Sequence, residues 1–72
     1  MAMLAAERRN QIVKLLNSVG TITVAELSNL FQVTTETIRR DLDALEQRNM
    51  VKRIHGGAMA LKSKQEIPFD MR

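Results

Sequence analysis

Residues 23–45, TVAELSNLFQVTTETIRRDLDAL, indicate two helices joined by a tight turn. Thr23 and Glu26 have the T-x-x-E spacing of a capping box, in which the two side chains bind free amides at a helix start. The helix that begins there is expected to end near Phe31, because Gln32-Val33 follow as the turn. A second helix start comes directly after them.

The second helix is expected over residues 35–48, with Thr34 as its N-cap. Its apolar residues Ile38, Leu42 and Leu45 recur at i, i+4 and i+7, so that one face packs on the core. Projection at about 100° per residue leaves a polar face opposite this stripe. Its members are Glu36, Arg40, Asp43 and Gln47, with Thr37 and Arg39 on the two flanks.

An amphipathic helix is also predicted ahead of this stretch, over residues 4–19. Its apolar stripe at i, i+3, i+4 and i+7 consists of Ile12, Leu15, Leu16 and Val19. Gly20 stands where a C-cap glycine belongs, because glycine adopts positive φ without steric cost. Residues 21–23, all β-branched, are enough for one short extended segment.

After the second helix, Asn49 can adopt the left-handed conformation that ends a helix. Two short apolar-rich runs follow, residues 50–54 and 58–61, on either side of His55-Gly56-Gly57. A glycine pair between two such runs indicates a hairpin, since tight hairpin turns need positive φ. The alternation is imperfect, so the sequence leaves open which basic side chains of the first run face outward.

The order of elements predicts a mainly α domain with a small β-hairpin. We therefore expect a winged helix-turn-helix, with a three-helix core and a wing of two or three strands. The domain is assigned to residues 1–61 and its helix-turn-helix to about 22–41. Residues 62–72 turn polar and are interpreted as a linker.

Composition narrows the classes of function. The chain of 72 residues has no cysteine, which excludes disulfides, thiolate zinc sites and cysteine nucleophiles and fits a reducing cytoplasm. His55, the one histidine, has no second histidine or cysteine beside it, so neither a metal nor a cofactor is expected.

We also expect no membrane contact, because no apolar run is long enough to span a bilayer or serve as a signal peptide. Without a phosphate-binding glycine loop or a plausible nucleophile, the chain is not expected to be an enzyme.

The charge favours an anionic partner, since the net charge is +3 and the isoelectric point is near 10.0. From residue 48 to residue 64 every charged side chain is basic: Arg48, Lys52, Arg53, Lys62 and Lys64. A helix with a polar and basic outer face fits the major groove of DNA, about 12 Å wide, and a basic hairpin can reach the adjacent backbone. Single strands are disfavoured, because few aromatic side chains are available for stacking. The alternative is a protein-interaction module, whose outer helix face should be apolar or acidic.

Arg40 is the base-reading candidate with the clearest physical reason, because arginine can bond bidentately to O6 and N7 of guanine. The alternative is a surface arginine paired with Asp43, three residues on. Glu36 can accept from a cytosine amine, although stabilisation of the helix dipole explains it equally well. The predicted base-reading residues all lie in the first half of this helix: Thr35, Glu36, Thr37 and Arg40.

Contacts to the DNA backbone are expected from the first helix, the helix flanks and the wing. The predicted set is Arg8, Arg9, Thr23, Arg39, Lys52, Arg53, His55, Gly56 and Gly57. The two glycines would let the main chain approach DNA closely, although a turn alone also explains them. Asp41, beside the apolar stripe, is expected to be an internal partner for a nearby arginine.

The pattern Leu27-Ser28-x-x-x-Gln32-Val33-Thr34-x-x-Thr37-Ile38-x-Arg40-x-Leu42 resembles the helix-turn-helix signature. Residues 37–42, TIRRDL, together with residues 51–58, VKRIHGGA, closely resemble the DeoR family of bacterial regulators, and Glu7-Arg8-Arg9-x-x-Ile12 matches as well. The resemblance covers about residues 5 to 60. Gln32 stands where the general signature favours glycine, which makes the turn slightly costlier.

This resemblance implies a winged helix-turn-helix domain that binds an operator in double-stranded DNA. In full-length members a larger domain follows, which senses a phosphorylated sugar and assembles oligomers, and most members repress genes of carbohydrate metabolism. Residues 62–72 would then lead toward an effector-sensing domain outside this chain. The parent protein is expected to be a homo-oligomer, whereas the isolated domain can be a monomer.

Overall fold

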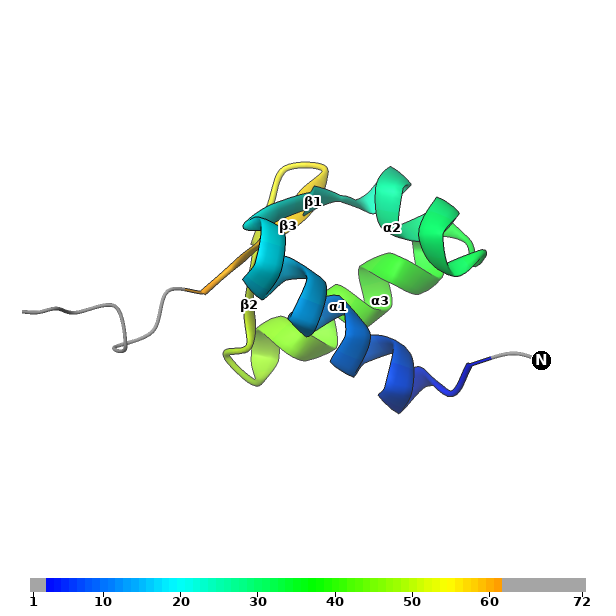
Figure 1. Cartoon of the computed structure of the whole chain (residues 1–72), viewed down its shortest axis with the longest axis horizontal. Helices are drawn as coiled ribbons and strands as arrows, with labels where there is room; N and C mark the ends of the chain where they lie inside the picture. Colours follow the sequence, from blue (N-terminus) through cyan, green and yellow to red (C-terminus); the bar gives the residue numbers. More distant parts are fainter. Residues whose placement is uncertain (1–2, 62–72) are drawn as a thin grey trace, which may run out of the picture.

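The computed structural model describes residues 3–61 as three helices and one three-stranded antiparallel sheet (Figure 1). The elements in chain order are α1 (Ala5–Val19), β1 (Thr21–Thr23), α2 (Val24–Phe31), α3 (Thr35–Gln47), β2 (Val51–Ile54) and β3 (Gly57–Ala60). The expected winged helix-turn-helix fold is confirmed. The predicted linker, residues 62–72, lies outside the described residues.

Local capping forms the helix-turn-helix as the sequence predicts. Thr23 and Glu26 exchange two hydrogen bonds of 3.0 Å, each side chain accepting from the other residue's amide. The Thr34 hydroxyl accepts from the Thr37 amide at 3.1 Å at the start of α3. Gln32 has a φ of 57°, in the left-handed region that glycine adopts most easily. This conformation explains why glycine is favoured at that position of the signature.

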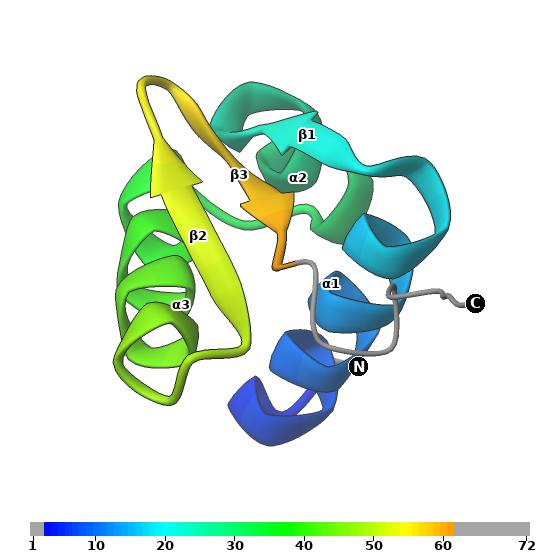
Figure 2. The same cartoon turned by 90° about the vertical axis from the view of Figure 1, so that its left-hand side faces the viewer.

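The sheet joins segments from both ends of the domain. Its strand order is β1-β3-β2, so that β3 lies between the strand before α2 and the strand after α3. Thr21 is opposite Met59 in one pairing, and Val51 is opposite Ala60 in the other. Figure 2 shows β2 alongside α3 and β1 at the other edge. The wing is therefore held against both helices of the helix-turn-helix.

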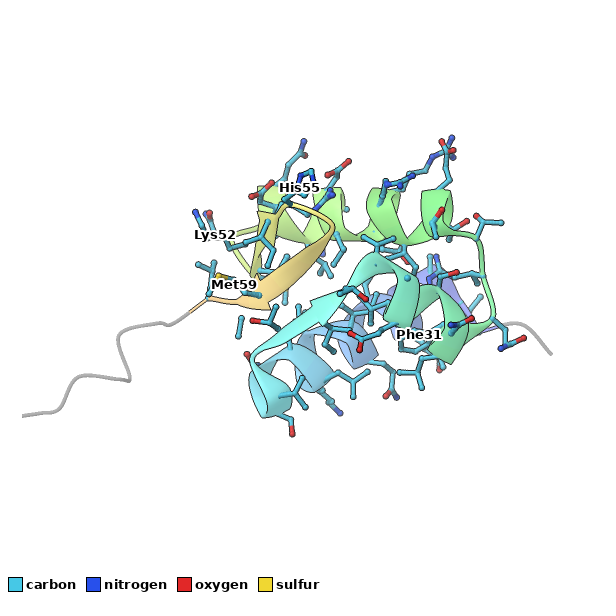
Figure 3. All side chains as sticks on the ribbon, turned by 90° about the horizontal axis from the view of Figure 1, so that it is seen from above. Phe31, Lys52, His55 and Met59 are labelled. Atoms are coloured by element: carbon cyan, nitrogen blue, oxygen red, sulfur yellow. The ribbon has the colours of Figure 1, made fainter. Side chains whose placement is uncertain are left out.

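One hydrophobic cluster forms the core, and it contains the predicted stripe of α3. The buried members are Ile12, Leu16, Ile22, Val24, Leu27, Ile38, Leu42, Leu45, Val51 and Ala58. Phe31 and Leu15 are partly buried against this cluster, and Figure 3 shows Phe31 at the end of the domain away from the wing. The prediction that Val19 is buried is wrong, because its side chain is 61% exposed. Val19 is the last residue of α1, beyond the part of the helix that packs on the core.

The end of α3 is close to its prediction, with Gln47 as its last residue and Asn49 at a φ of 59°. In the part of the chain that the structure describes, no helix combines the length and apolar character needed to cross a membrane.

The two wing glycines have different roles, and only one of them serves the turn through its φ. Gly56 has a φ of 76°, whereas Gly57 has no positive φ and begins β3. A Cβ atom on Gly57 would lie 2.5 Å from the Ile22 carbonyl oxygen and 2.9 Å from the Thr23 Cα. Gly57 is buried and allows β1 to approach β3 closely, so its place in the predicted DNA-contact set is not supported by the fold.

The two glycines differ in a testable way. Gly57→Ala should lower the free energy of unfolding by about 3 kcal/mol, because main-chain atoms of β1 would have to move. Gly56→Ala should cost only about 1 kcal/mol, because the added methyl meets open space and only the positive φ opposes it. Urea denaturation followed by circular dichroism measures both. Equal costs, or a larger cost at Gly56, would contradict the close approach described here.

Candidate nucleic-acid interface

The outer face of α3, formed by Glu36, Arg40, Asp43 and Gln47, is exposed because the opposite stripe is buried. The Arg40 guanidinium lies 3.6 Å from the Glu36 carboxylate, and these side chains are 77% and 70% exposed. The expected alternative partner of Arg40, Asp43, pairs instead with Arg53. An ion pair as exposed as that of Arg40 is weak, so this guanidinium can exchange its partner for a ligand.

The first turn of α3 contains the other predicted base-reading residues. Thr35 and Glu36 are exposed, whereas Thr37 is half-buried. The Thr37 hydroxyl lies 3.0 Å from the Thr34 hydroxyl oxygen, so Thr37 takes part in the helix cap. Arg39, on the flank toward the wing, is exposed, and no ion pair joins it to another of residues 3–61.

A concavity of about 450 Å³ lies between α3, the start of α2 and the wing. Its lining comes from three separate parts of the sequence: Val24, Ala25, Thr35, Arg39, Arg53, His55 and Gly56. The Val24 amide donates to the Gly56 carbonyl oxygen at 2.8 Å, which attaches the wing turn to α2. Figure 3 shows His55 beside the outward-pointing side chains of α3. The fold thus brings the predicted helix and wing turn onto one side of the molecule.

The alternation of β2 decides which of its basic residues face outward. Val51 is buried, so that Arg53, two residues on, lies on the same inner side, while Lys52 is exposed on the other side. The Arg53 side chain is 24% exposed and pairs with Asp43, and its amide donates to the Glu46 carboxylate at 3.1 Å. Lys52 therefore remains available for a phosphate, whereas Arg53 is occupied within the fold.

Sequence reasoning missed that Asp43 and Glu46 bind Arg53. Counting in twos from the apolar Val51 would have placed Arg53 on the inner side of β2, facing acidic residues of α3. The alternation from Val51 was visible in the sequence, but it points to these acidic residues only once β2 is known to pack on α3.

Arg8 and Arg9 of α1 bind Asp41, which confirms the expectation that Asp41 is an internal partner. The Asp41 side chain is 1% exposed and that of Arg8 is 12% exposed. Arg8 donates to both carboxylate oxygens, through Nε to Oδ2 and through Nη2 to Oδ1 at 3.0 Å. Arg9 Nε donates to Oδ1 at 2.9 Å and is 34% exposed. Arg8 thus occupies a structural position beneath the surface, which does not favour the phosphate contact predicted for it.

The electrostatics of this cluster keep the buried carboxylate charged. Burial alone would raise the pKa of Asp41, but the hydrogen bonds and charges of Arg8 and Arg9 outweigh it and lower that pKa below its ordinary value. The hydrogen bond with Asp41 also raises the pKa of Arg8. The stabilisation from this cluster is therefore present above the ordinary carboxyl pKa and is lost as the pH falls through the lowered value.

The fold and this surface define a winged helix-turn-helix domain, in which a basic wing lies beside α3. The chain matches the model of the DeoR-like helix-turn-helix domain over residues 8–64 and belongs to that family. The comparison with solved structures gives no match.

Similar proteins are transcriptional regulators. The uncharacterized HTH-type transcriptional regulator YulB of Bacillus subtilis strain 168 is 49% identical over 97% of this chain and 28% of its own length. The HTH-type transcriptional regulator GolR of Listeria innocua is 48% identical over 90% of this chain and 26% of its own length. The glycerol-3-phosphate regulon repressor of Escherichia coli strain K12 is 37% identical over 97% of this chain and 28% of its own length. The chain thus spans little more than a quarter of each of these relatives.

The Asp41 cluster predicts a specific pattern of stability. Asp41→Asn should lower the free energy of unfolding by about 3 kcal/mol, because Arg8 would stay buried without an anion. The double variant Arg8→Met/Asp41→Leu should recover most of this loss, since no unpaired charge remains inside. Urea denaturation at neutral pH measures the three proteins. A double variant that is less stable than Asp41→Asn would show that the cluster does not act as a charge pair.

Proposed function

We propose that this domain binds a specific operator in double-stranded DNA, with α3 in the major groove and the wing on the adjacent backbone. The observation that supports this most is that α3 and the wing turn lie on the same side of the molecule. Arg39, Arg40 and His55 are exposed there, and none of the exposed large apolar residues of the described chain lies in α3 or the wing turn. A protruding helix fits a groove that admits one helix, and a turn beside that helix can reach the adjacent backbone.

Base edges are assigned to the first half of α3. Arg40 is the main base-reading residue, because its exposed guanidinium can bind guanine bidentately, and Glu36 can orient it from one helical turn earlier. Thr35 and Thr37 stand at the amino end of the helix, where hydroxyls can meet a base or a phosphate. In the structure Thr37 is partly used by the cap, so Thr35 is the freer of the two.

Phosphate contacts are assigned to Arg39, His55 and the main chain at Gly56, which line the concavity between α3 and the wing, and to Lys52, which is exposed on the other side of β2. Thr23 adjoins them at the start of α2. Arg9 keeps a partly exposed side chain, but its bond to Asp41 makes it a secondary contact at most. These contacts would position the domain on the duplex without reading its sequence.

We further propose that the chain is the operator-binding part of a longer cytoplasmic repressor of carbohydrate metabolism. The family supports this, and so does the relative named as a glycerol-3-phosphate regulon repressor. A phosphorylated sugar would then act on a part of that protein beyond this chain, and a homo-oligomer would bind paired half-sites. An isolated domain would bind a half-site weakly, because avidity is lost.

A protein-interaction module fits the outer face of α3 less well. The exposed large apolar residues of the described chain are Met3, Leu4, Val19, Leu30, Met50 and Leu61. None of these lies in α3, whose outer face is polar and charged. The most exposed of them, Leu4, Val19 and Leu30, lie just before α1, at its end and in α2, and such scattering is ordinary for a protein surface.

Arg40 provides the test of sequence reading. A duplex is first selected from a random pool with the wild-type chain, and binding of wild type and Arg40→Ala is then measured on that duplex and on random DNA. The variant should lose about 10-fold or more on the selected duplex, as expected for one bidentate pair, and much less on random DNA. Equal losses would show that Arg40 does not read bases, and a pool that yields no preferred duplex would overturn the proposed function.

Lys52 provides the test of the wing. Lys52→Ala should weaken all duplexes alike and reduce the slope of log K against log salt by about one, because one phosphate contact is lost. Lys14→Ala is the matched control, since Lys14 is exposed on α1, which packs on the opposite side of α3 from its outer face. An unchanged slope in Lys52→Ala would show that the wing is not part of the interface.

A further inference from the structure

We propose that Asp43, Glu46 and Arg53 form a clamp that fixes the wing relative to α3 and thereby positions Lys52 and His55 for the DNA backbone. These three residues, called the wing clamp below, are positioning residues. The inference rests on the proposed function, which supplies the ligand that the wing would meet.

The first observation is the edge of the sheet. The strand order leaves β2 with β3 on one side only, and α3 runs along its other side (Figure 2). On that side the Arg53 amide donates to the Glu46 carboxylate at 3.1 Å. An edge strand normally offers such an amide to water or to another strand. Here a side chain of α3 takes it, which ties the main chain of the wing to the helix.

The second observation is the path of the Arg53 side chain. It lies on the inner side of β2, and its Nη1 donates to the Asp43 carboxylate of α3. Its Nε lies 3.4 Å from the Gly57 carbonyl oxygen of β3. One guanidinium therefore contacts the helix and the returning strand of the hairpin together. The Arg53 side chain is only 24% exposed, which limits the alternatives open to it.

The third observation is the location of Asp43. Its side chain is 64% exposed on the same outer face of α3 as Arg40. A carboxylate on a surface that meets phosphates opposes binding, so simple electrostatics would favour a neutral residue there. Its bond to Arg53 gives a physical reason for the charge. If this bond positions the wing, neutralising Asp43 should weaken DNA binding, whereas the loss of a repulsive charge alone should strengthen it.

The clamp works together with the attachment of the wing turn to α2. The Gly56 carbonyl accepts from Val24 at 2.8 Å and holds the tip, while Arg53 holds the strand. Lys52 points to the opposite side of that strand, so its direction depends on how β2 sits on α3. Loss of Asp43 would release the Arg53 side chain to solvent and leave β2 tied to α3 only by the bond between the Arg53 amide and Glu46.

The test compares two isosteric changes on the outer face of α3. Asp43→Asn and Glu36→Gln each remove one negative charge, and binding is measured on a random-sequence duplex so that base reading does not contribute. Glu36→Gln, the matched control, should bind about twofold more tightly because one repulsive charge is gone. Asp43→Asn should bind about threefold or more weakly, because the wing loses its position. Asp43→Glu, which keeps the charge, should regain much of the lost affinity.

The double variant Asp43→Asn/Lys52→Ala tests whether the clamp acts through Lys52. If it does, Lys52→Ala should change the affinity and the salt slope less in the Asp43→Asn background than in wild type, by about threefold in affinity. The inference is overturned if Asp43→Asn tightens binding as Glu36→Gln does and Lys52→Ala keeps its full effect in both backgrounds.

A measurement without DNA separates this inference from the proposed function. Hydrogen exchange at the Arg53 amide should become about tenfold faster in Asp43→Asn, with the melting temperature recorded to exclude general unfolding. Unchanged exchange would show that Asp43 does not hold the wing. A wild-type chain that binds no duplex would overturn the proposed function, and the exchange result would still decide whether the clamp exists.

Discussion

The bond between Asp41 and the two arginines of α1 ties the helix with the exposed arginines to the rest of the domain. A domain of this length buries a small core, so helix packing alone leaves limited resistance to a shift or rotation of α3. Asp41 is a buried carboxylate whose two oxygens both accept from arginine, a geometry that a rotated helix would lose. Because Arg40 directly precedes Asp41, the bonds that hold Asp41 also fix the direction in which the exposed Arg40 side chain leaves the helix.

Each side of α3 has a separate task. One stripe packs on the core, one flank binds α1 through Asp41, and the other flank meets the wing through Glu46. The remaining side is exposed and holds Arg40. Since three sides are occupied, the proposed function confines substitutions that change sequence preference without harming the fold to the fourth side. Under the proposed function, this division would let one short helix serve both the stability of the domain and the reading of DNA.

Features set by neighbours in the chain were predicted well from the sequence. The Thr23–Glu26 box, the Thr34 cap and the left-handed Asn49 depend on residues a few positions apart, and all are present. The stripe of α3 was also correct, because the whole helix lies against the core. Such features need no knowledge of the tertiary fold.

Most features set by distant contacts were not predicted, although the internal pairing of Asp41 with an arginine was. Val19 has the right helical phase but stands past the packed region, and Gly57 is small because β1 crosses beside it. The burial of Arg8 and of Arg53 depends on carboxylates of α3 that lie far away in the sequence. The sequence shows that these residues are basic, and the fold decides whether the charge faces water or an internal anion.

The central place of β3 in the sheet has a consequence for synthesis of the chain. β3 pairs on one side with β1, which is made long before it, and on the other with β2, which is made just before it. While the ribosome still holds Gly57–Ala60, the helices can form but β1 has no strand to pair with. The sheet closes only when Gly57–Ala60 emerge, so β1 and β2 are joined through β3 in one late step rather than strand by strand.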